Sequence, residues 1–207
     1  MKNKRLITGS LITLFLIILS FLFDVKIVQF FVGLRNLQLD SFFIGVSFLS
    51  NILIIFFILT SLFLWNENKR RWIFPLWLSG FFAIVISFIM KSLIARPRPY
   101  QEGSVQVLGI ALKFIEESHS VWNFSFPSFH AMLVFASLPI LIKEFKKIRY
   151  VWFVFACLVA FSRMYFGVHY MSDILAGALI GYLIGCLMIV VEEKKEYGKR
   201  LMRRIRL

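Results

Sequence analysis

Six long apolar segments constrain this chain more than any other feature. They cover residues 6–23, 42–65, 72–93, 129–142, 150–168 and 174–191. At about 1.5 Å rise per residue, a helix of roughly 18 residues is nearly as long as the bilayer hydrocarbon is thick. Hydrophobic residues make up 59% of the chain, more than a soluble core absorbs. The pattern predicts an all-α, polytopic membrane protein with a six-transmembrane-helix bundle, in which the fourth segment is the shortest.

The longest polar stretch between these segments covers residues 95–128, and the stretches contain no repeat and no soluble domain. We therefore expect a single integral membrane domain over residues 1–207. A basic start, "MKNKR", precedes the first segment, but no small-x-small cleavage site follows it, so we expect a retained first span. Residues 24–40 alternate imperfectly between apolar and polar and suggest an amphipathic helix in the outer interface. Pro97 and Pro99 should end the third helix.

The basic residues are distributed unevenly between the two sides of such a bundle. If the N-terminus is cytoplasmic, 17 of the 24 Lys and Arg residues fall on the cytoplasmic side, namely Lys2, Lys4, Arg5, Lys69, Arg70, Arg71, Lys143, Lys146, Lys147, Arg149, Lys194, Lys195, Lys199, Arg200, Arg203, Arg204 and Arg206. This bias predicts six spans with both termini in the cytoplasm of a cell membrane. The net charge of +13 then indicates anionic headgroups beside a basic tail at about 192–207, and no nucleic acid partner.

Three polar pieces interrupt the apolar pattern on the face that this topology places outside. They are "KSLIARPRP" with Lys91 and Arg98, "PSFH" at 127–130, and "SRMYFGVHYMSD" at 162–173 with Arg163, His169 and Asp173. Charged groups at membrane depth are costly unless they are paired, face water or take part in chemistry. Something on this face therefore requires positive charge.

The three cations of these pieces point to a phosphate. Lys91, Arg98 and Arg163 would repel one another at one place unless an anion joined them. Arginine fits phosphate in a bidentate manner, and lysine acts as a point charge. The fourth segment begins at the same place, and the free N–H groups of a helix N-terminus favour an anion there. Ser128 is placed to cap that helix or to bind a phosphate oxygen.

Two histidines make this site a reactive one. His169 and Asp173 are four residues apart, so a helix would place them on one face. A carboxylate that accepts a proton from one ring nitrogen leaves the lone pair of the other nitrogen free to attack. His130 comes from another helix and can protonate the departing oxygen. Apart from Asp173 and Glu102, no acid lies near these motifs to hold magnesium, so we expect no metal and no cofactor.

These pieces resemble the three signature motifs of the type 2 phosphatidic acid phosphatase family, the membrane relatives of vanadium haloperoxidases and bacterial acid phosphatases. The family patterns are Lys-x6-Arg-Pro, Pro-Ser-Gly-His and Ser-Arg-x5-His-x3-Asp. This chain matches them at Lys91, Arg98 and Pro99, at Pro127, Ser128 and His130, and at Ser162, Arg163, His169 and Asp173. The resemblance covers most of the chain and implies a core like that of the acid phosphatases and haloperoxidases.

The resemblance also implies a role for each residue. His169 would attack phosphorus and form a phosphohistidine, with Asp173 orienting it. His130 would protonate the leaving group and later activate water. The phosphate oxygens would be held by Lys91, Arg98, Ser128, Arg163 and the backbone N–H of Phe129.

Phe129 is a departure from the family pattern, which has glycine at this position. The backbone donor survives, because every residue except proline has an N–H group. If the turn requires left-handed geometry, phenylalanine strains it. We expect instead that residue 129 is already helical and that its side chain reshapes the wall of the pocket.

The sequence thus predicts an enzyme that hydrolyses a membrane lipid phosphate on the extracytoplasmic side without a metal. A polyprenyl (undecaprenyl) diphosphate, phosphatidic acid and phosphatidylglycerol phosphate are the candidate substrates, and the outward face favours the first. The alternatives are a lipid phosphotransferase and a non-catalytic lipid-phosphate binder or transporter. The motif patterns leave out His119 and Arg96, which lie in the same outer loop. We expect His119 to be structural and Arg96 to contact headgroups or water.

Overall fold

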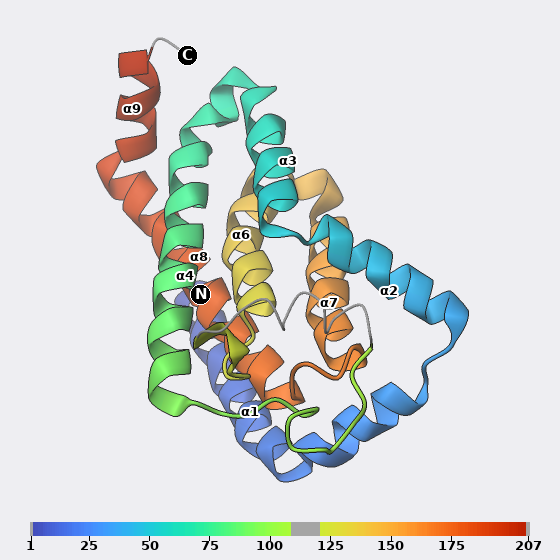
Figure 1. The fold of residues 1–207 in the computed structure, drawn as a ribbon. Helices are drawn as coiled ribbons and strands as arrows, with labels where there is room; N and C mark the ends of the chain where they lie inside the picture. Colours follow the sequence, from blue (N-terminus) through green and yellow to red (C-terminus); the bar gives the residue numbers. More distant parts are fainter. Residues whose placement is uncertain (1, 109–120, 206–207) are drawn as a thin grey trace.

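The computed structural model describes residues 2–108 and 121–205, and in this part of the chain the regular elements are all helical (Figure 1). The α-helices are α1 (Lys2–Gly33), α2 (Leu37–Leu49), α3 (Ile52–Leu64), α4 (Ile73–Ile94), α6 (Phe129–Glu144), α7 (Arg149–Tyr165), α8 (Met171–Lys195) and α9 (Tyr197–Ile205). Three short 3-10 helices join them: η1 (Glu67–Trp72), η2 (Val121–Asn123) and η3 (Lys146–Ile148). His119 lies outside the described residues, so its expected structural role stays a prediction.

Several helices are long and apolar enough to cross a membrane. By length and composition, the described residues contain four such helices, Ile7–Gly33, Glu67–Ile94, Lys146–Tyr165 and Met171–Lys195. A fifth crossing results if α2 and α3, which meet at 58°, form one broken span. The prediction of an all-α, multi-pass membrane protein is therefore confirmed. The count of six remains a prediction, because α6 has only 16 residues and a crossing takes about 20.

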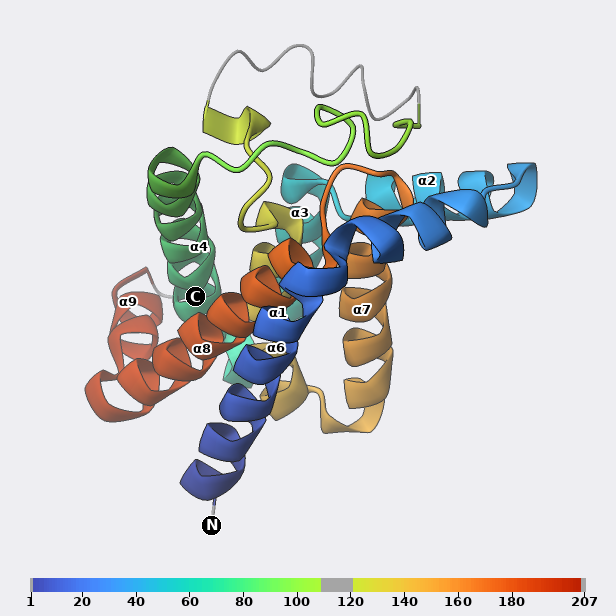
Figure 2. The ribbon, with the colours of Figure 1, turned by 90° about the horizontal axis from the view of Figure 1, so that it is seen from below.

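Helix α6 occupies the centre of the bundle, and α4, α7 and α8 pack around it (Figures 1 and 2). Its buried side chains lie all round the helix and include Met132, Leu133, Val134 and Leu138. A helix that is apolar on every side is one that its neighbours enclose. This enclosure explains how a short segment holds its place in the bundle and carries the second motif at its first turn.

Three glycines allow α8 to lie directly against α6. Gly177, Gly181 and Gly185 recur every fourth residue, and a Cβ built on each would overlap a carbonyl oxygen of the facing α6 segment. Small residues at this spacing are typical of close helix–helix contact in membranes. The contact brings the first turns of both helices together, where the backbone N–H of Ser128 donates to the carbonyl oxygen of Asp173 at 3.0 Å.

We predict that Gly181→Ala lowers the thermal stability of the protein in detergent, by about 1–3 kcal/mol of unfolding free energy. Its new methyl group would overlap the carbonyl oxygen of Met132, and rigid backbone cannot move away. Gly45→Ala is the matched control, since it lies within α2 and a Cβ there meets nothing within 4 Å. Because alanine favours helix, the control should be neutral or stabilising. Equal melting temperatures for the two variants would contradict the proposed contact.

Two sequence expectations about element boundaries are wrong. Helix α1 is continuous to Gly33, so residue 24 is not a helix boundary, although α1 bends sharply and its last part runs sideways towards α2 (Figures 1 and 2). Asn36 instead starts α2, because its side chain accepts from the N–H groups of Gln38 and Leu39. The segment 42–65 is also not one helix, because the chain breaks between Leu49 and Ile52, where serine and asparagine side chains compete for backbone groups.

The third helix ends as predicted, and the bundle has two distinct ends. Helix α4 stops at Ile94, and Ala95 adopts a left-handed conformation with φ of 47° just before Pro97. The ends of α4 and α7 and the starts of α6 and α8 lie at the lower end of Figure 1. The basic η1, η3 and α9 lie towards the opposite end.

Candidate active site

Arg98 ties the loop after α4 to the turn before α8. Its side chain is 8% exposed and donates to the carbonyl oxygens of Trp122 (2.7 Å), Asn123 (3.0 Å) and Val168 (3.0 Å). Nη1 also lies 3.5 Å from Nε2 of His169. A guanidinium has five N–H donors, so these three carbonyls leave donors for an anion beside His169.

Two further buried cations, Lys91 and Arg163, approach from other helices. Lys91, in the last turn of α4, is 1% exposed. It donates to the carbonyl oxygens of Phe124 and Ser125, the latter at 3.4 Å. Arg163, in the last turn of α7, donates to the hydroxyl of Ser47 on α2. Lys91, Arg98 and Arg163 are called the cation cluster below.

His169 and Asp173 face each other, with Ser125 beside them. His169 Nδ1 lies 3.6 Å from Asp173 Oδ2, a distance longer than a hydrogen bond. The hydroxyl of Ser125 donates to the same Oδ2 and lies 3.4 Å from Nδ1 of His169. The backbone N–H of Tyr170 also donates to Oδ2, at 2.8 Å. Ser125 therefore bridges the pair, a role that the sequence patterns did not indicate.

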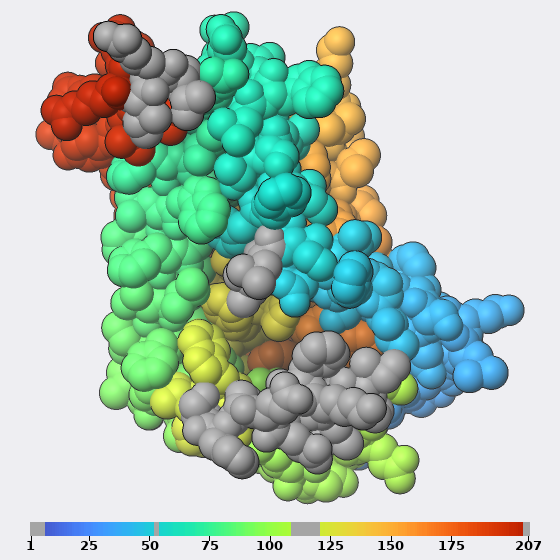
Figure 3. Space-filling view, turned by 45° about the horizontal axis from the view of Figure 1, so that its top comes forward, coloured from blue at the N-terminus to red at the C-terminus, as the bar shows by residue number. Residues whose placement is uncertain are grey.

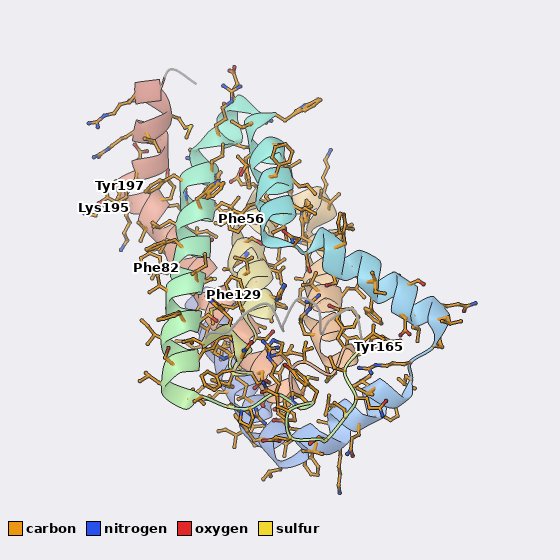
Figure 4. All side chains as sticks on the ribbon, in the orientation of Figure 1. Phe56, Phe82, Phe129, Tyr165, Lys195 and Tyr197 are labelled. Carbon is orange, nitrogen blue, oxygen red and sulfur yellow. The ribbon has the colours of Figure 1, made fainter. Side chains whose placement is uncertain are left out.

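Ser128 and Phe129 form the start of α6. Ser128 is fully buried, makes no capping bond through its hydroxyl, and its Oγ has no hydrogen-bond partner among the described residues. A buried hydroxyl of this kind is suited to a phosphate oxygen. Phe129 is the first residue of α6, so the prediction that it is helical is confirmed. Its ring packs against that of Trp122, with 5.2 Å between the ring centroids, on the side of α6 that faces α4 (Figure 4).

The two histidines share one electrostatic environment. Electrostatic interactions link the half-buried His130 to His169 and to all three residues of the cation cluster. Burial, followed by the charges of Arg98, Lys91 and Arg163, holds the pKa of His169 well below its usual range. His169 is thus neutral near neutral pH, with a ring lone pair available.

Arg96 corrects one sequence expectation. The sequence predicted contact with headgroups or water, but the guanidinium of Arg96 binds two carboxylates. Nη1 donates to Asp173 Oδ1 at 2.9 Å, and Nη2 donates to Asp24 Oδ2 at 2.8 Å. Burial lowers the pKa of Arg96, but these two carboxylates outweigh burial and raise it. Asp24, on α1, was missed by the motif patterns. Its position among apolar residues, in "SFLFDVKIV", is the signal that could have revealed it.

All eight residues selected from the sequence belong to the last turns of α4 and α7, the first turns of α6 and α8, or the segments that adjoin these turns: Lys91, Arg98, Ser128, Phe129, His130, Arg163, His169 and Asp173. Among residues 2–108 and 121–205, no three His, Cys, Asp or Glu side chains gather as metal ligands would. The surface between α4 and the α2–α3 pair is hollowed, and atoms of α6 are visible inside the hollow (Figure 3). The arrangement suits an anion held by cations beside two imidazoles.

Comparisons with known proteins relate the chain to one family. A model of the PAP2 superfamily matches residues 72–197. Bacitracin transport permease protein BcrC of Bacillus licheniformis is 38% identical over 101 residues, which span 49% of this chain and 46% of that protein. Undecaprenyl-diphosphatase BcrC of Bacillus subtilis is 26% identical over 156 residues, 74% of this chain and 75% of that protein. The match thus covers less than half of the first relative and three quarters of the second.

A solved structure shares the fold over almost the whole chain. The transmembrane PAP2 type phosphatidylglycerolphosphate phosphatase of Bacillus subtilis superposes with a TM-score of 0.68 at 23% identity. The superposition covers 92% of this chain and 96% of that one. The likeness therefore extends to α1–α3, which the family model does not cover.

Proposed function

The chain belongs to the PAP2 superfamily, and on this premise we propose that it is a membrane lipid phosphatase. Its substrate is a polyprenyl diphosphate, which it hydrolyses through a phosphohistidine at His169 without a metal. One observation carries the proposal: the neutral His169 directs Nε2 towards Arg98 and Nδ1 towards Asp173. A nucleophile with an orienting carboxylate on one side and a phosphate-binding cation on the other is built for phosphoryl transfer.

The substrate proposal rests on relatives and on the position of the site. A relative that aligns over three quarters of its length is an undecaprenyl-diphosphatase, and the solved structure is a phosphatidylglycerolphosphate phosphatase. A diphosphate carries more negative charge than a monoester, and the cation cluster of Lys91, Arg98 and Arg163 suits it. Phosphatidic acid and phosphatidylglycerol phosphate are the other candidates.

In the first step, the lone pair on Nε2 of His169 attacks the terminal phosphorus. The P–N bond forms as the P–O bond to the lipid breaks, and protonated His130 gives its proton to the departing oxygen. The cation cluster, the hydroxyl of Ser128 and the backbone N–H of Phe129 hold the phosphate oxygens. Asp173 stabilises the proton on Nδ1 by its nearby negative charge and through the hydroxyl of Ser125.

In the second step, His130, now neutral, takes a proton from water. The resulting hydroxide attacks the phosphohistidine, the P–N bond breaks, and inorganic phosphate leaves. Proton and charge balance are restored, because His130 is protonated again and His169 is neutral. The cations stabilise the charge of both transition states, the part that a metal ion plays in many phosphatases.

The test is phosphate release by the purified protein in detergent, with EDTA present, from undecaprenyl diphosphate, phosphatidic acid and phosphatidylglycerol phosphate. Release from the diphosphate at the highest kcat/KM supports the proposal. Preference for another lipid overturns the substrate assignment, and loss of release with EDTA overturns metal independence. Release only after an acceptor alcohol is added would identify a phosphotransferase, and binding without any release would identify a binder or transporter.

We also propose a single domain over residues 1–207 that crosses the membrane six times, with a core like that of acid phosphatases and haloperoxidases. Both termini and the basic tail at about 192–207 are cytoplasmic, and the site is extracytoplasmic. The separation of the basic η1, η3 and α9 from the site supports this orientation (Figure 1).

Labelling tests the orientation. We predict that a membrane-impermeant maleimide labels Gly103→Cys, in the loop after α4, in intact cells whose native Cys157 and Cys186 are replaced. Asn68→Cys, exposed in η1 at the other end, should react only after the cells are opened. The reverse pattern would place the site in the cytoplasm.

The pKa of His169 predicts a pH profile. Burial and the cation cluster lower this pKa, so neutral His169 persists below the usual histidine value of about 6.5. We predict that the acid limb of kcat/KM lies below about pH 6.5. Arg98→Gln removes one positive charge, raises the pKa of His169 and should move this limb to higher pH. Lys26→Gln, an exposed cation on α1, is the control and should leave the limb in place. Ionisation of the substrate affects the native protein and both variants equally. If the acid limb of Arg98→Gln lies at the native pH, the charge of Arg98 does not control the pKa of His169.

A further inference from the structure

Asp24 is a buried carboxylate that the proposed reaction does not use. It lies on α1 and is 2% exposed. Its Oδ1 accepts from the backbone N–H of Ser172 at 3.0 Å, and its Oδ2 accepts from the hydroxyl of Ser172 and from Arg96 at 2.8 Å. A buried carboxylate is costly, so three hydrogen bonds that tie Asp24 to Ser172 and Arg96 indicate a function.

These contacts converge on the start of α8. Ser172 is in the first turn of α8, directly before Asp173. A negative charge at a helix N-terminus is favourable, so Asp24 stabilises this turn from the side of α1. Packing between α1 and α8 is extensive (Figure 2), so α1 is a firm support for the contact.

Arg96 provides the second link. Its guanidinium lies between the two carboxylates, with Nη2 on Asp24 and Nη1 on Asp173. Stacking over the ring of Tyr170, at 4.1 Å from its centroid, holds the guanidinium in this plane. Asp173 is thus held through Arg96 on Oδ1, while Oδ2 faces Ser125 and His169.

We propose that Asp24 is a positioning residue of the active site, which acts through Arg96 and Ser172 to hold the Asp173 carboxylate against His169. Without Asp24, Arg96 loses one of its two carboxylate partners, and Ser172 in the first turn of α8 loses the acceptor of its N–H and hydroxyl groups. Asp173 then no longer selects one orientation and one tautomer of His169. The cation cluster that binds phosphate does not contact Asp24, so substrate binding is retained. The catalytic consequence rests on the proposed function, whereas the effect on the His169 ring does not.

The primary experiment is ¹⁵N-histidine NMR of the full chain in detergent, comparing the native protein with Asp24→Asn. The three histidines are assigned by single substitution. We expect the native His169 to show one neutral tautomer with its proton on Nδ1, and Asp24→Asn to show a mixture of tautomers. An unchanged His169 signal overturns the inference whether or not the protein turns over any lipid.

The second readout is kinetic, with undecaprenyl diphosphate as substrate and phosphohistidine trapped by alkaline quench. In single turnovers, Asp24→Asn should lower the rate constant of phosphohistidine formation about tenfold. The inhibition constant of inorganic phosphate should stay within about twofold, because the cation cluster is intact. If Asp24→Asn only lowers the fraction of folded protein, the amplitude of phosphohistidine formation falls while its rate constant stays native. A native rate constant in this variant therefore refutes the inference.

Two variants complete the design. Asp40→Asn is the matched control, since this half-buried carboxylate accepts from Tyr165 and lies away from Asp173; it should change neither readout. Ser172→Ala keeps both charges and removes only the hydroxyl link to Asp24, so it tests the inference if Asp24→Asn does not fold. It should produce the same tautomer mixture to a smaller extent, and a native spectrum would count against the link. A native protein that hydrolyses no lipid phosphate refutes the proposed function and leaves the NMR test standing.

Discussion

His169→Ala should abolish phosphate release from every lipid phosphate that the native protein hydrolyses, a loss of about 10⁴-fold or more. The change removes the atom that forms the P–N bond, and water in its place lacks both the position and the basicity to react. The cation cluster and Ser128 remain, so the variant should still bind inorganic phosphate. Release of inorganic phosphate and covalent labelling by ³²P-labelled substrate are the two measurements, and both should disappear.

The control for this experiment is His119→Ala. His119 lies outside the three motifs, so this variant should retain native turnover and native labelling. Turnover by His169→Ala above about one per cent of the native rate would refute the nucleophile assignment, because a variant that lacks its essential nucleophile retains far less activity.

His130→Ala should separate the two chemical steps. We predict that steady-state release falls about 10²- to 10⁴-fold, because the general acid and base is lost. The leaving group is the lipid monophosphate, which departs without prior protonation more readily than an alcohol, so His169 can still be phosphorylated. Water then attacks slowly, and the phosphohistidine accumulates to nearly one per protein. Rapid mixing with ³²P-labelled undecaprenyl diphosphate, followed by alkaline quench, measures the burst.

Two outcomes distinguish the roles of His130. A slow steady state without accumulated phosphohistidine means that His130 acts mainly in the first step, as the acid. Unchanged turnover excludes it from both steps. Gly45→Ala, on α2 where an added Cβ meets nothing within 4 Å, serves as a control for handling in detergent and should show native burst and steady-state rates.

Much of the site was predictable because its residues lie in short motifs at fixed spacing. His169 and Asp173 are only four residues apart in the sequence. Helix α8 begins at Met171, so His169 lies in the turn before it and not on its face, yet the short separation still brings the two side chains together. The helical conformation of Phe129 was predictable for a similar reason, since residue 129 begins the apolar segment that forms α6. Local spacing and helical periodicity carry this information.

The support around the motifs was not predictable in this way. Asp24 and Ser172 are separated by 148 residues, and Arg96 and Asp173 by 77. Their meeting depends on how α1 packs against α8 and on the path of the loop after α4, which no spacing records. The break between α2 and α3 and the extension of α1 to Gly33 were missed because hydropathy marks apolar length and is insensitive to a bend.

The sequence by itself determined that this protein lies in a bilayer, that it is helical, and which chemical groups form its site. The length of the apolar segments and the types of charged residue are properties of the chain alone. Only the tertiary structure decided how those groups are held. Three glycines on α8 bring it against α6, Ser125 enters the gap between His169 and Asp173, and Arg96 joins Asp173 to Asp24. Buried charges must find partners wherever packing places them, and packing depends on the whole bundle.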